Sequence, residues 1–318
     1  HSRIAGDFVG YLALKRALGR KLVSEEKVLR HLDRFLACRF PAVRDLSAPL
    51  LEAWMAASPG LLPQSRAVRL RVVRQFCLYR RRAVPGAFVP DRTMHRTLWP
   101  VRVPRHVPFI FTKEQVRNLL RAALALPDPH RSGRSRAFFT VLLLLYTTGL
   151  RLSEAVRLRL GDVDLAAGTL LVRETKFFKT RLVPVATDVL RQLRLQVDAL
   201  SPPKTRTIDQ PLFQHAGRAY SVITVGATGR QLLRASGLKP ARGRAGPRLH
   251  CMRHTFAVHR IAQWYAEGAD VQSRLPALAT YMGHSSIEST QYYATVTAEI
   301  LEHAGRRFER ACAPHEER

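Results

Sequence analysis

Five prolines between residues 85 and 108 prevent a helix from running through this part of the chain. Proline lacks the backbone N–H of a helical hydrogen bond, and its ring clashes with the preceding turn. Helical patterns occupy the sequence on both sides, so this stretch separates two parts that fold around their own cores. The 318 residues suffice for about two domains of roughly 100–200 residues each. We therefore expect one domain at 1–100, a basic linker at 101–108 and a second domain at 109–318.

The first domain is predicted to be helical, because its apolar residues recur every three or four positions. A first helix is expected to end near Gly19, and a second to run from Ser24, whose hydroxyl would cap its first turn, to Pro41. Two more are expected at about 49–57 and 64–82. The last has an apolar face and an arginine face, so it can pack on a bundle and lie along phosphates at once.

The second domain combines helices with one short hairpin. Residues 169–173 and 181–185 are predicted to be strands, and a polar turn joins them. The predicted fold class is therefore mainly α with a small β-sheet (α+β). The helical patterns of this domain lie at 113–126, 135–148, 153–159, 187–199, 219–236, 253–266 and 297–310.

The charge of the chain indicates a polyanionic partner. Lys and Arg number 52 against 24 Asp and Glu, which gives a formal net charge of +28 spread along the sequence. Arg predominates, and its planar guanidinium can bind a phosphate with two hydrogen bonds at once. A basic linker between two basic domains also suits a clamp that closes around a duplex, so double-stranded DNA is the polyanion that we expect. The predicted DNA-contacting residues are Arg66, Arg69, Arg74, Arg102, Arg105, Lys179 and Arg181.

Other classes of protein are disfavoured by the composition. The longest apolar run, at 138–146, contains Thr140 and is much shorter than the ~18 residues of a membrane span. The four cysteines lie far apart, so they predict neither a zinc ribbon nor a disulfide framework. We expect no metal, no cofactor and no membrane, and a reducing cytosol as the location.

Four separate patches of the second domain hold reactive side chains. Taken singly, Arg151 can be a structural partner of Glu154, and Lys176 can be a solvated turn residue. The spacing of His250 and His254 would suit zinc, but no glutamate follows His250 as it does in zinc proteases. The patches are TGLRLSE at 148–154, the hairpin turn with Lys176, HCMRH at 250–254, and GHSSI with the following TQYY at 283–293.

In this order, the four patches together resemble the tyrosine recombinase (phage integrase) family. The resemblance covers 109–300 and implies a helical, SAM-like core-binding domain followed by a mixed α/β catalytic domain, forming a C-shaped clamp on DNA. This chain departs from the family at Thr175 and Phe177, where glycines commonly flank the hairpin lysine, and at Met282, where leucine is usual. The strings that carry the resemblance are TGLRLSEA at 148–155, TKFFKTRLVPV at 175–185, LHCMRHTF at 249–256 and YMGHSSIESTQYY at 281–293.

The resemblance implies a role for each reactive residue. Two guanidiniums can stabilise the growing charge on a scissile phosphate in place of a metal ion. A tyrosine nucleophile with an ordinary pKa near 10 needs a proton acceptor, and His250 is the candidate. Lys176 would protonate the leaving 5′-oxygen, with Lys179 as the alternative. The implied catalytic set is Arg151, Lys176, His250, Arg253, His284 and the nucleophile Tyr293, with Tyr292 as its alternative and Glu154 orienting its neighbours.

The implied function is site-specific recombination or integration for a mobile element. Strands would be cut and rejoined through a 3′-phosphotyrosine and a Holliday junction, by a homotetramer on synapsed DNA that is a monomer or dimer when free. Accessory DNA-bending proteins are further candidate partners, and the expected location is the cytoplasm, on the nucleoid. The helix at 297–310 could dock on a neighbouring subunit or on its own. The alternatives are a type IB topoisomerase-like activity, a catalytically silent DNA-binding accessory protein, and a zinc nuclease using His250, His254 and His284.

Overall fold

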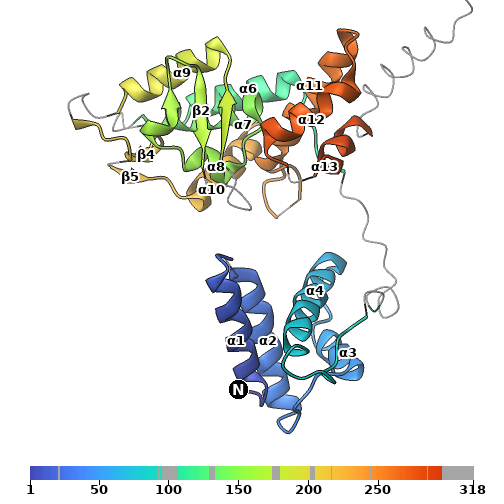
Figure 1. Cartoon of the computed structure of the whole chain (residues 1–318). Coiled ribbons are helices and arrows are strands. Elements are labelled where there is room, and N and C mark those ends of the chain that lie inside the picture. The colour runs from blue at the N-terminus through green and yellow to red at the C-terminus, as the bar shows by residue number, and fades with distance from the viewer. Residues whose placement is uncertain are drawn as a thin grey trace, which may run out of the picture. The chain divides into compact units, whose positions relative to one another are not determined.

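The chain divides into two compact units, residues 1–106 and residues 107–318, and each has its own hydrophobic core (Figure 1). The predicted helix at 297–310 lies outside the described residues. The computed structural model describes residues 1–20, 22–91, 94, 107–128, 133–173, 180–200, 205–215, 217–243, 245–284 and 286–295.

The first unit is a bundle of helices. Its core is aromatic at the centre: the rings of Phe8 and Phe76 lie 4.4 Å apart, and Trp54 is fully buried. The indole N–H of Trp54 lies 2.8 Å from Nδ1 of His31, so the one polar atom of this large side chain is satisfied. The helices are α1 (Ala5–Ala17), α2 (Val23–Arg39), α3 (Ala48–Ala56) and α4 (Pro63–Arg80).

The start of α2 differs from the prediction. Leu22, not Ser24, occupies the N-cap position, and no side chain caps the helix. Leu22 is buried in the core, and its carbonyl already accepts the N–H of Glu26, so the helix begins before the serine. At the other end of the bundle, Arg80 of α4 pairs with Asp7 and Asp45, which ties the helix end to α1 and to the segment before α3.

The second unit contains the predicted hairpin. Strands β2 (Thr169–Val172) and β3 (Arg181–Pro184) pair antiparallel, with Leu170 opposite Val183. A two-residue strand, β1 (Val163–Asp164), extends this sheet in the order β1-β2-β3. A second small sheet joins β4 (Gln214–His215) to β5 (Arg218–Ala219). The fold is thus mainly helical with small sheets, and the predicted fold class is confirmed.

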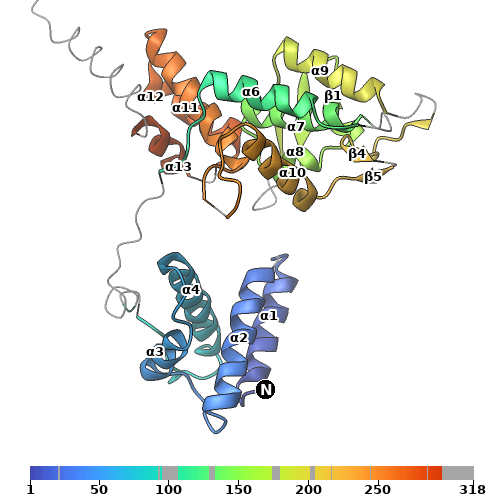
Figure 2. The ribbon, with the colours of Figure 1, turned by 180° about the vertical axis from the view of Figure 1, so that it is seen from behind.

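Helix α7 lies at the centre of the second unit, beside α6, α9 and α11, as the reverse view in Figure 2 also shows. Most of α7 is buried, which fits its long apolar run. Over the described ranges, no helix combines the length and apolar composition that crossing a membrane requires. The helices are α6 (Lys113–Leu124), α7 (Arg134–Thr148), α8 (Leu152–Val156), α9 (Thr187–Asp198), α10 (Val222–Ala235), α11 (His250–Ala266), α12 (Val271–Met282) and α13 (Glu288–Gln291), with 3₁₀ turns η1 (Leu160–Asp162) and η3 (Tyr292–Thr295).

Candidate active site

The turn between α7 and α8 positions Arg151. Gly149 ends α7 in the left-handed region at φ 62°, and a Cβ there would lie 2.5 Å from the ring of Phe256. Two residues later Arg151 is the N-cap of α8, and its backbone N–H donates to the Glu154 carboxylate at 3.0 Å. Its Nη1 donates to the other oxygen of Glu154 at 2.6 Å. The predicted Arg151–Glu154 pair therefore exists, and it fixes the direction of the guanidinium.

Arg253 reaches the same place from α11. It is only 2% exposed, and it donates to the carbonyl of Gly149 at 2.5 Å and to that of Met282 at 2.8 Å. Arg151 donates to the next carbonyl, that of Gly283, at 2.9 Å. Burial, and then the positive charge of Arg151, lower the pKa of Arg253 to about 10. Two guanidiniums are thus held on consecutive carbonyls at the end of α12, an arrangement that favours a bound anion.

Glu154 lies between two arginines. Arg181, the first residue of β3, donates through Nη2 to the Glu154 carboxylate at 2.9 Å and through Nε to the carbonyl of Tyr281 at 2.9 Å. Burial raises the pKa of Glu154, but the hydrogen bonds from Arg181 and Arg151 outweigh burial and leave the pKa below its ordinary value. Arg181 was predicted to contact DNA. The structure places its head inside the protein, where it holds the Glu154 carboxylate.

Tyr293 is buried in this site. It lies in η3, is 4% exposed, and packs with Phe256 and its neighbours on α11 and α12. Its hydroxyl oxygen lies 2.7 Å from Nδ1 of His254. Burial raises the pKa of Tyr293, while Arg253 and Arg151 oppose that rise, and the net pKa stays above the ordinary value. The phenol is therefore protonated at neutral pH and needs a base before it can act as a nucleophile.

Two further histidines surround the arginine pair. His284, next after Gly283, makes a 2.6 Å hydrogen bond through Nδ1 to the hydroxyl of Thr290. Burial, and then the charges of Arg253 and Arg151, lower the pKa of His284 to about 3. His250 begins α11, and partial burial followed by the same two arginines lowers its pKa too. Both imidazoles are therefore neutral at pH 7 and can donate a hydrogen bond to an anion without adding charge.

The structure gathers most of the predicted catalytic residues in one site of the second unit. Lys176 and Lys179 lie outside the described residues. His254 entered the sequence interpretation only as a zinc ligand, and its contact with the tyrosine was missed. The available signal was its position four residues after His250 on one helix face. Among the described residues, no three His, Cys, Asp or Glu side chains gather as metal ligands would. The residues brought together are Arg151, Glu154, His250, Arg253, His284 and Tyr293.

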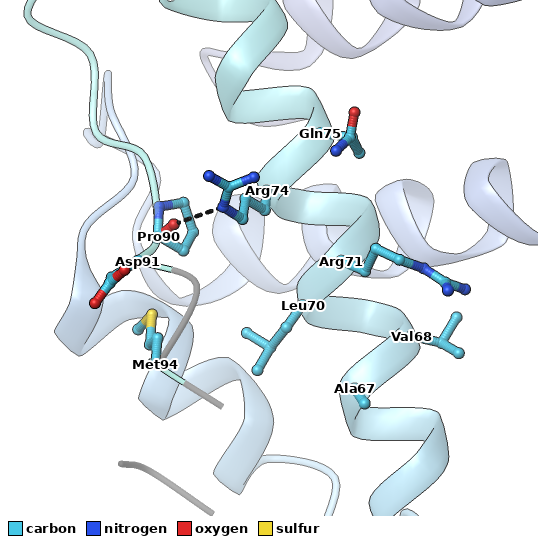
Figure 3. A pocket seen from close by; sticks show the side chains of 9 residues that line it. All are labelled: Ala67, Val68, Leu70, Arg71, Arg74, Gln75, Pro90, Asp91 and Met94. Carbon is cyan, nitrogen blue, oxygen red and sulfur yellow. Dashed lines mark hydrogen bonds between the residues drawn. The ribbon is translucent and has the colours of Figure 1, made fainter. Parts of the chain in front are cut away.

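The predicted DNA-contacting arginines of α4 are half-buried and have partners within the first unit. Arg74 donates to the carbonyl of Pro90 at 3.1 Å, across a pocket of about 310 Å³ (Figure 3). Arg69 donates to the hydroxyl of Ser58 at 3.1 Å and lies 5.1 Å above the ring of Trp54. Arg66 donates to the carbonyl of Pro59 at 3.2 Å. Arg102 and Arg105 lie outside the described residues.

The sequence of this chain is similar to those of known proteins. Residues 110–299 match the model of the phage integrase family. The protein y4rB of Sinorhizobium fredii, an integrase/recombinase by its name, is 35% identical over 307 residues, which cover 94% of this chain and 95% of y4rB. Tyrosine recombinase XerD of Rhizobium meliloti is 32% identical over 302 residues, covering 91% and 89%. The chain therefore belongs to the phage integrase family, and it is an enzyme of site-specific DNA recombination.

Solved structures share the fold. The integrase of transposon Tn1549, in complex with circular intermediate DNA, matches with a TM-score of 0.66 at 20% identity, covering 95% of this chain and 98% of that one. The XerH site-specific recombinase, bound to a palindromic difH substrate after cleavage, matches with a TM-score of 0.67 at 17% identity, covering 89% and 78%. At 17–20% identity, these matches define the fold alone.

Proposed function

We propose that this recombinase cleaves duplex DNA with Tyr293 and holds the broken strand as a 3′-phosphotyrosine. The observation that carries the proposal is the position of Tyr293 against helix α11, where its hydroxyl lies 2.7 Å from Nδ1 of His254, the residue directly after Arg253. We propose that a phosphate bound by the two guanidiniums lies within reach of this hydroxyl.

The arginine pair would supply the charge stabilisation. As the tyrosine oxygen attacks, negative charge grows on the two non-bridging oxygens of the phosphate. Arg151 and Arg253 are already fixed by Glu154 and by backbone carbonyls, so they need little reorganisation during the reaction. The neutral imidazoles of His250 and His284 would add hydrogen bonds. This arrangement stabilises the transition state with the chain's own cations.

The proposed reaction exchanges one ester for another. A bond forms between Tyr293 Oη and phosphorus, and the bond from phosphorus to the 5′-oxygen of the next nucleotide breaks. Lys176 is proposed to protonate that leaving oxygen, with Lys179 as the alternative. The phosphotyrosine ester retains the energy of the broken linkage, so a new 5′-hydroxyl can rejoin the strand without ATP.

The proposed substrate is double-stranded DNA with a specific recombination site. The net charge of +28 favours such a partner, and the Tn1549 integrase and XerH are described in complexes with DNA. We propose a homotetramer on synapsed DNA, a monomer or dimer when free, accessory DNA-bending proteins, and a nucleoid location in the cytoplasm. A mobile element is the proposed setting. The predicted contacts from Arg66, Arg69, Arg74, Arg102, Arg105, Lys179 and Arg181 remain predictions.

A nicked suicide duplex carrying the core site tests the nucleophile. Cleavage releases a short 5′-hydroxyl fragment, which traps the covalent protein–DNA complex. We expect the complex to disappear in Tyr293→Phe and to persist in Tyr292→Phe, the matched control one residue away. A complex that persists in Tyr293→Phe contradicts the proposal. A second assay separates recombination from a type IB topoisomerase-like activity. A recombinase should exchange strands between two core sites and should not relax a supercoiled plasmid that lacks these sites.

A further inference from the structure

His254 contacts the reacting atom of the proposed nucleophile. Its Nδ1 lies 2.7 Å from the Tyr293 hydroxyl oxygen, within the ~2.6–3.2 Å reach that proton transfer requires. We infer that His254 fixes the Tyr293 hydroxyl and receives its proton as the oxygen attacks the phosphate. This inference rests on the proposed role of Tyr293 as the nucleophile, and it assigns to His254 the proton transfer for which His250 was the candidate in the sequence analysis.

The fold holds the two side chains together. Helix α11 carries His254 directly after the buried Arg253, and η3, which packs against α11, carries Tyr293. The two rings are 5.5 Å apart between centroids. Because Arg253 is fastened to the carbonyls of Gly149 and Met282, this turn of α11 is fixed. The hydrogen bond therefore follows from the same packing that builds the arginine pair.

Other acceptors for this proton are poorly suited. The hydroxyl is buried, so direct loss of its proton to bulk water is hindered. Arg151 and Arg253 are cations and cannot accept a proton. His284 already shares its Nδ1 with Thr290, and its pKa of about 3 makes it a weak base. The ring of His250 lies edge-on to that of His254, at 4.8 Å between centroids, and burial followed by the charges of Arg253 and Arg151 lowers its pKa, which makes it a weaker base.

Charged and titratable groups from three elements lie near His254. Among the described residues, these include His250 and Arg253 on α11, Tyr293 on η3, and His284 after α12. The pKa of Arg253, about 10, keeps it cationic at pH 7, and the pKa of His284, about 3, keeps that imidazole neutral.

The step balances in both directions. In cleavage, the O–H bond of Tyr293 breaks and its proton goes to Nδ1 of His254. The new bond joins Oη to phosphorus, and the leaving 5′-oxygen takes a proton from the general acid, for which Lys176 is proposed. In rejoining, the imidazolium of His254 returns its proton to the departing tyrosine oxygen. Cleavage therefore needs neutral His254, whereas rejoining needs protonated His254.

The pH dependence of single-turnover cleavage tests this assignment in the full-length protein. We expect the wild-type rate on the nicked duplex to rise with pH between about 5 and 8, where imidazoles titrate. In His254→Asn, the amide can occupy the place of Nδ1 but cannot take a proton. We expect the rate to fall by about 100-fold and the rise with pH to disappear. His250→Asn, one helical turn away, is the matched control and should be slower but keep the rise.

Several outcomes would overturn the inference. A His254→Asn protein with wild-type rate and pH profile would show that His254 only packs against the tyrosine. If the increase of the cleavage rate with pH disappears in His250→Asn but remains in His254→Asn, His250 is the proton acceptor instead of His254. If His254→Asn does not melt cooperatively, His254→Gln takes its place. The rate at which the wild-type protein rejoins DNA from a preformed covalent complex should fall as pH increases. A rejoining rate that increases with pH also contradicts the inference.

The failure of this inference is distinguishable from failure of the proposed function. Tyr293→Phe is measured in parallel. A covalent complex formed by Tyr293→Phe would show that Tyr293 is not the nucleophile, and it would also refute the role of His254. If Tyr293→Phe forms no covalent complex and His254→Asn has an unchanged pH profile, Tyr293 remains the nucleophile and only the role of His254 is refuted.

Discussion

Replacing Glu154 with glutamine should destabilise the second unit, because the carboxylate holds two arginines. One of its oxygens accepts Nη1 of Arg151, and the other accepts both the backbone N–H of Arg151 and Nη2 of Arg181. The amide must place an NH₂ group against at least one guanidinium donor. A lost hydrogen bond to a charged group costs about 1.5–3 kcal/mol, and the unneutralised arginines add to this cost. We expect a loss of about 3 kcal/mol in the free energy of unfolding.

Thermal unfolding followed by calorimetry measures this loss. For a unit of this size, about 3 kcal/mol corresponds to a Tm lower by roughly 6–12 °C. Glu267→Gln, an exposed position of the same unit, is the control and should change Tm by less than about 2 °C.

The stability lost in Glu154→Gln should also depend on pH. The folded-state pKa of Glu154 is below the ordinary value of about 4.3, so its stabilisation is fully present above that pH. This stabilisation is lost as pH falls through the lower folded-state pKa. The difference in the free energy of unfolding between wild type and Glu154→Gln should therefore become smaller at that pH. A Glu154→Gln protein that melts with the Glu267→Gln control at pH 7 would refute the reasoning.

Two further substitutions test the frame of the site. Gly149→Ala should lower the free energy of unfolding by about 2–4 kcal/mol, since it adds a clash with Phe256 to the strain of a left-handed residue. Gly237→Ala has a similar φ with nothing within 4 Å, so it should show only the backbone cost of about 1–2 kcal/mol in the same denaturant titration. Arg253→Lys should reduce covalent complex formation by at least about 100-fold, because one ammonium group cannot reproduce the guanidinium fork that two carbonyls hold. Its DNA affinity, measured by mobility shift, should stay within a few-fold of wild type. Equal losses in the two alanine variants, or a fully active lysine variant, would contradict these expectations.

The regular elements were largely predictable from local patterns. The hairpin strands and most helices lie within a few residues of the predicted ranges, because their apolar spacing reflects burial. Helix α12 was not predicted, since Pro276 within it is a residue that usually ends helices. The strands β1, β4 and β5 have two residues each, which is too short for any periodicity to show.

The contacts within the site were less predictable than its members. Arg151, Arg253, His284 and Tyr293 stand in recognisable strings, and the structure brings them together. The partners of Arg181 and His254 depend instead on residues 27 and 39 positions away in the sequence. A charge pattern does not specify such contacts, and helical spacing places His254 on the face of His250 without naming the tyrosine, because the contacts arise from the packing of β3 and η3 against other elements. Arg181 was therefore predicted only as a DNA contact, and His254 was weighed only in a zinc hypothesis that the sequence disfavoured.

The end of α12 fastens both guanidiniums to main-chain oxygens, those of Met282 and Gly283. Every amino acid carries such an oxygen, so the anchoring of these two cations does not depend on which side chain stands at position 282. This accounts for methionine in place of the usual leucine at that position. The apolar side chain at this position can therefore vary to adjust packing, while the geometry of the arginine pair is set by the backbone itself.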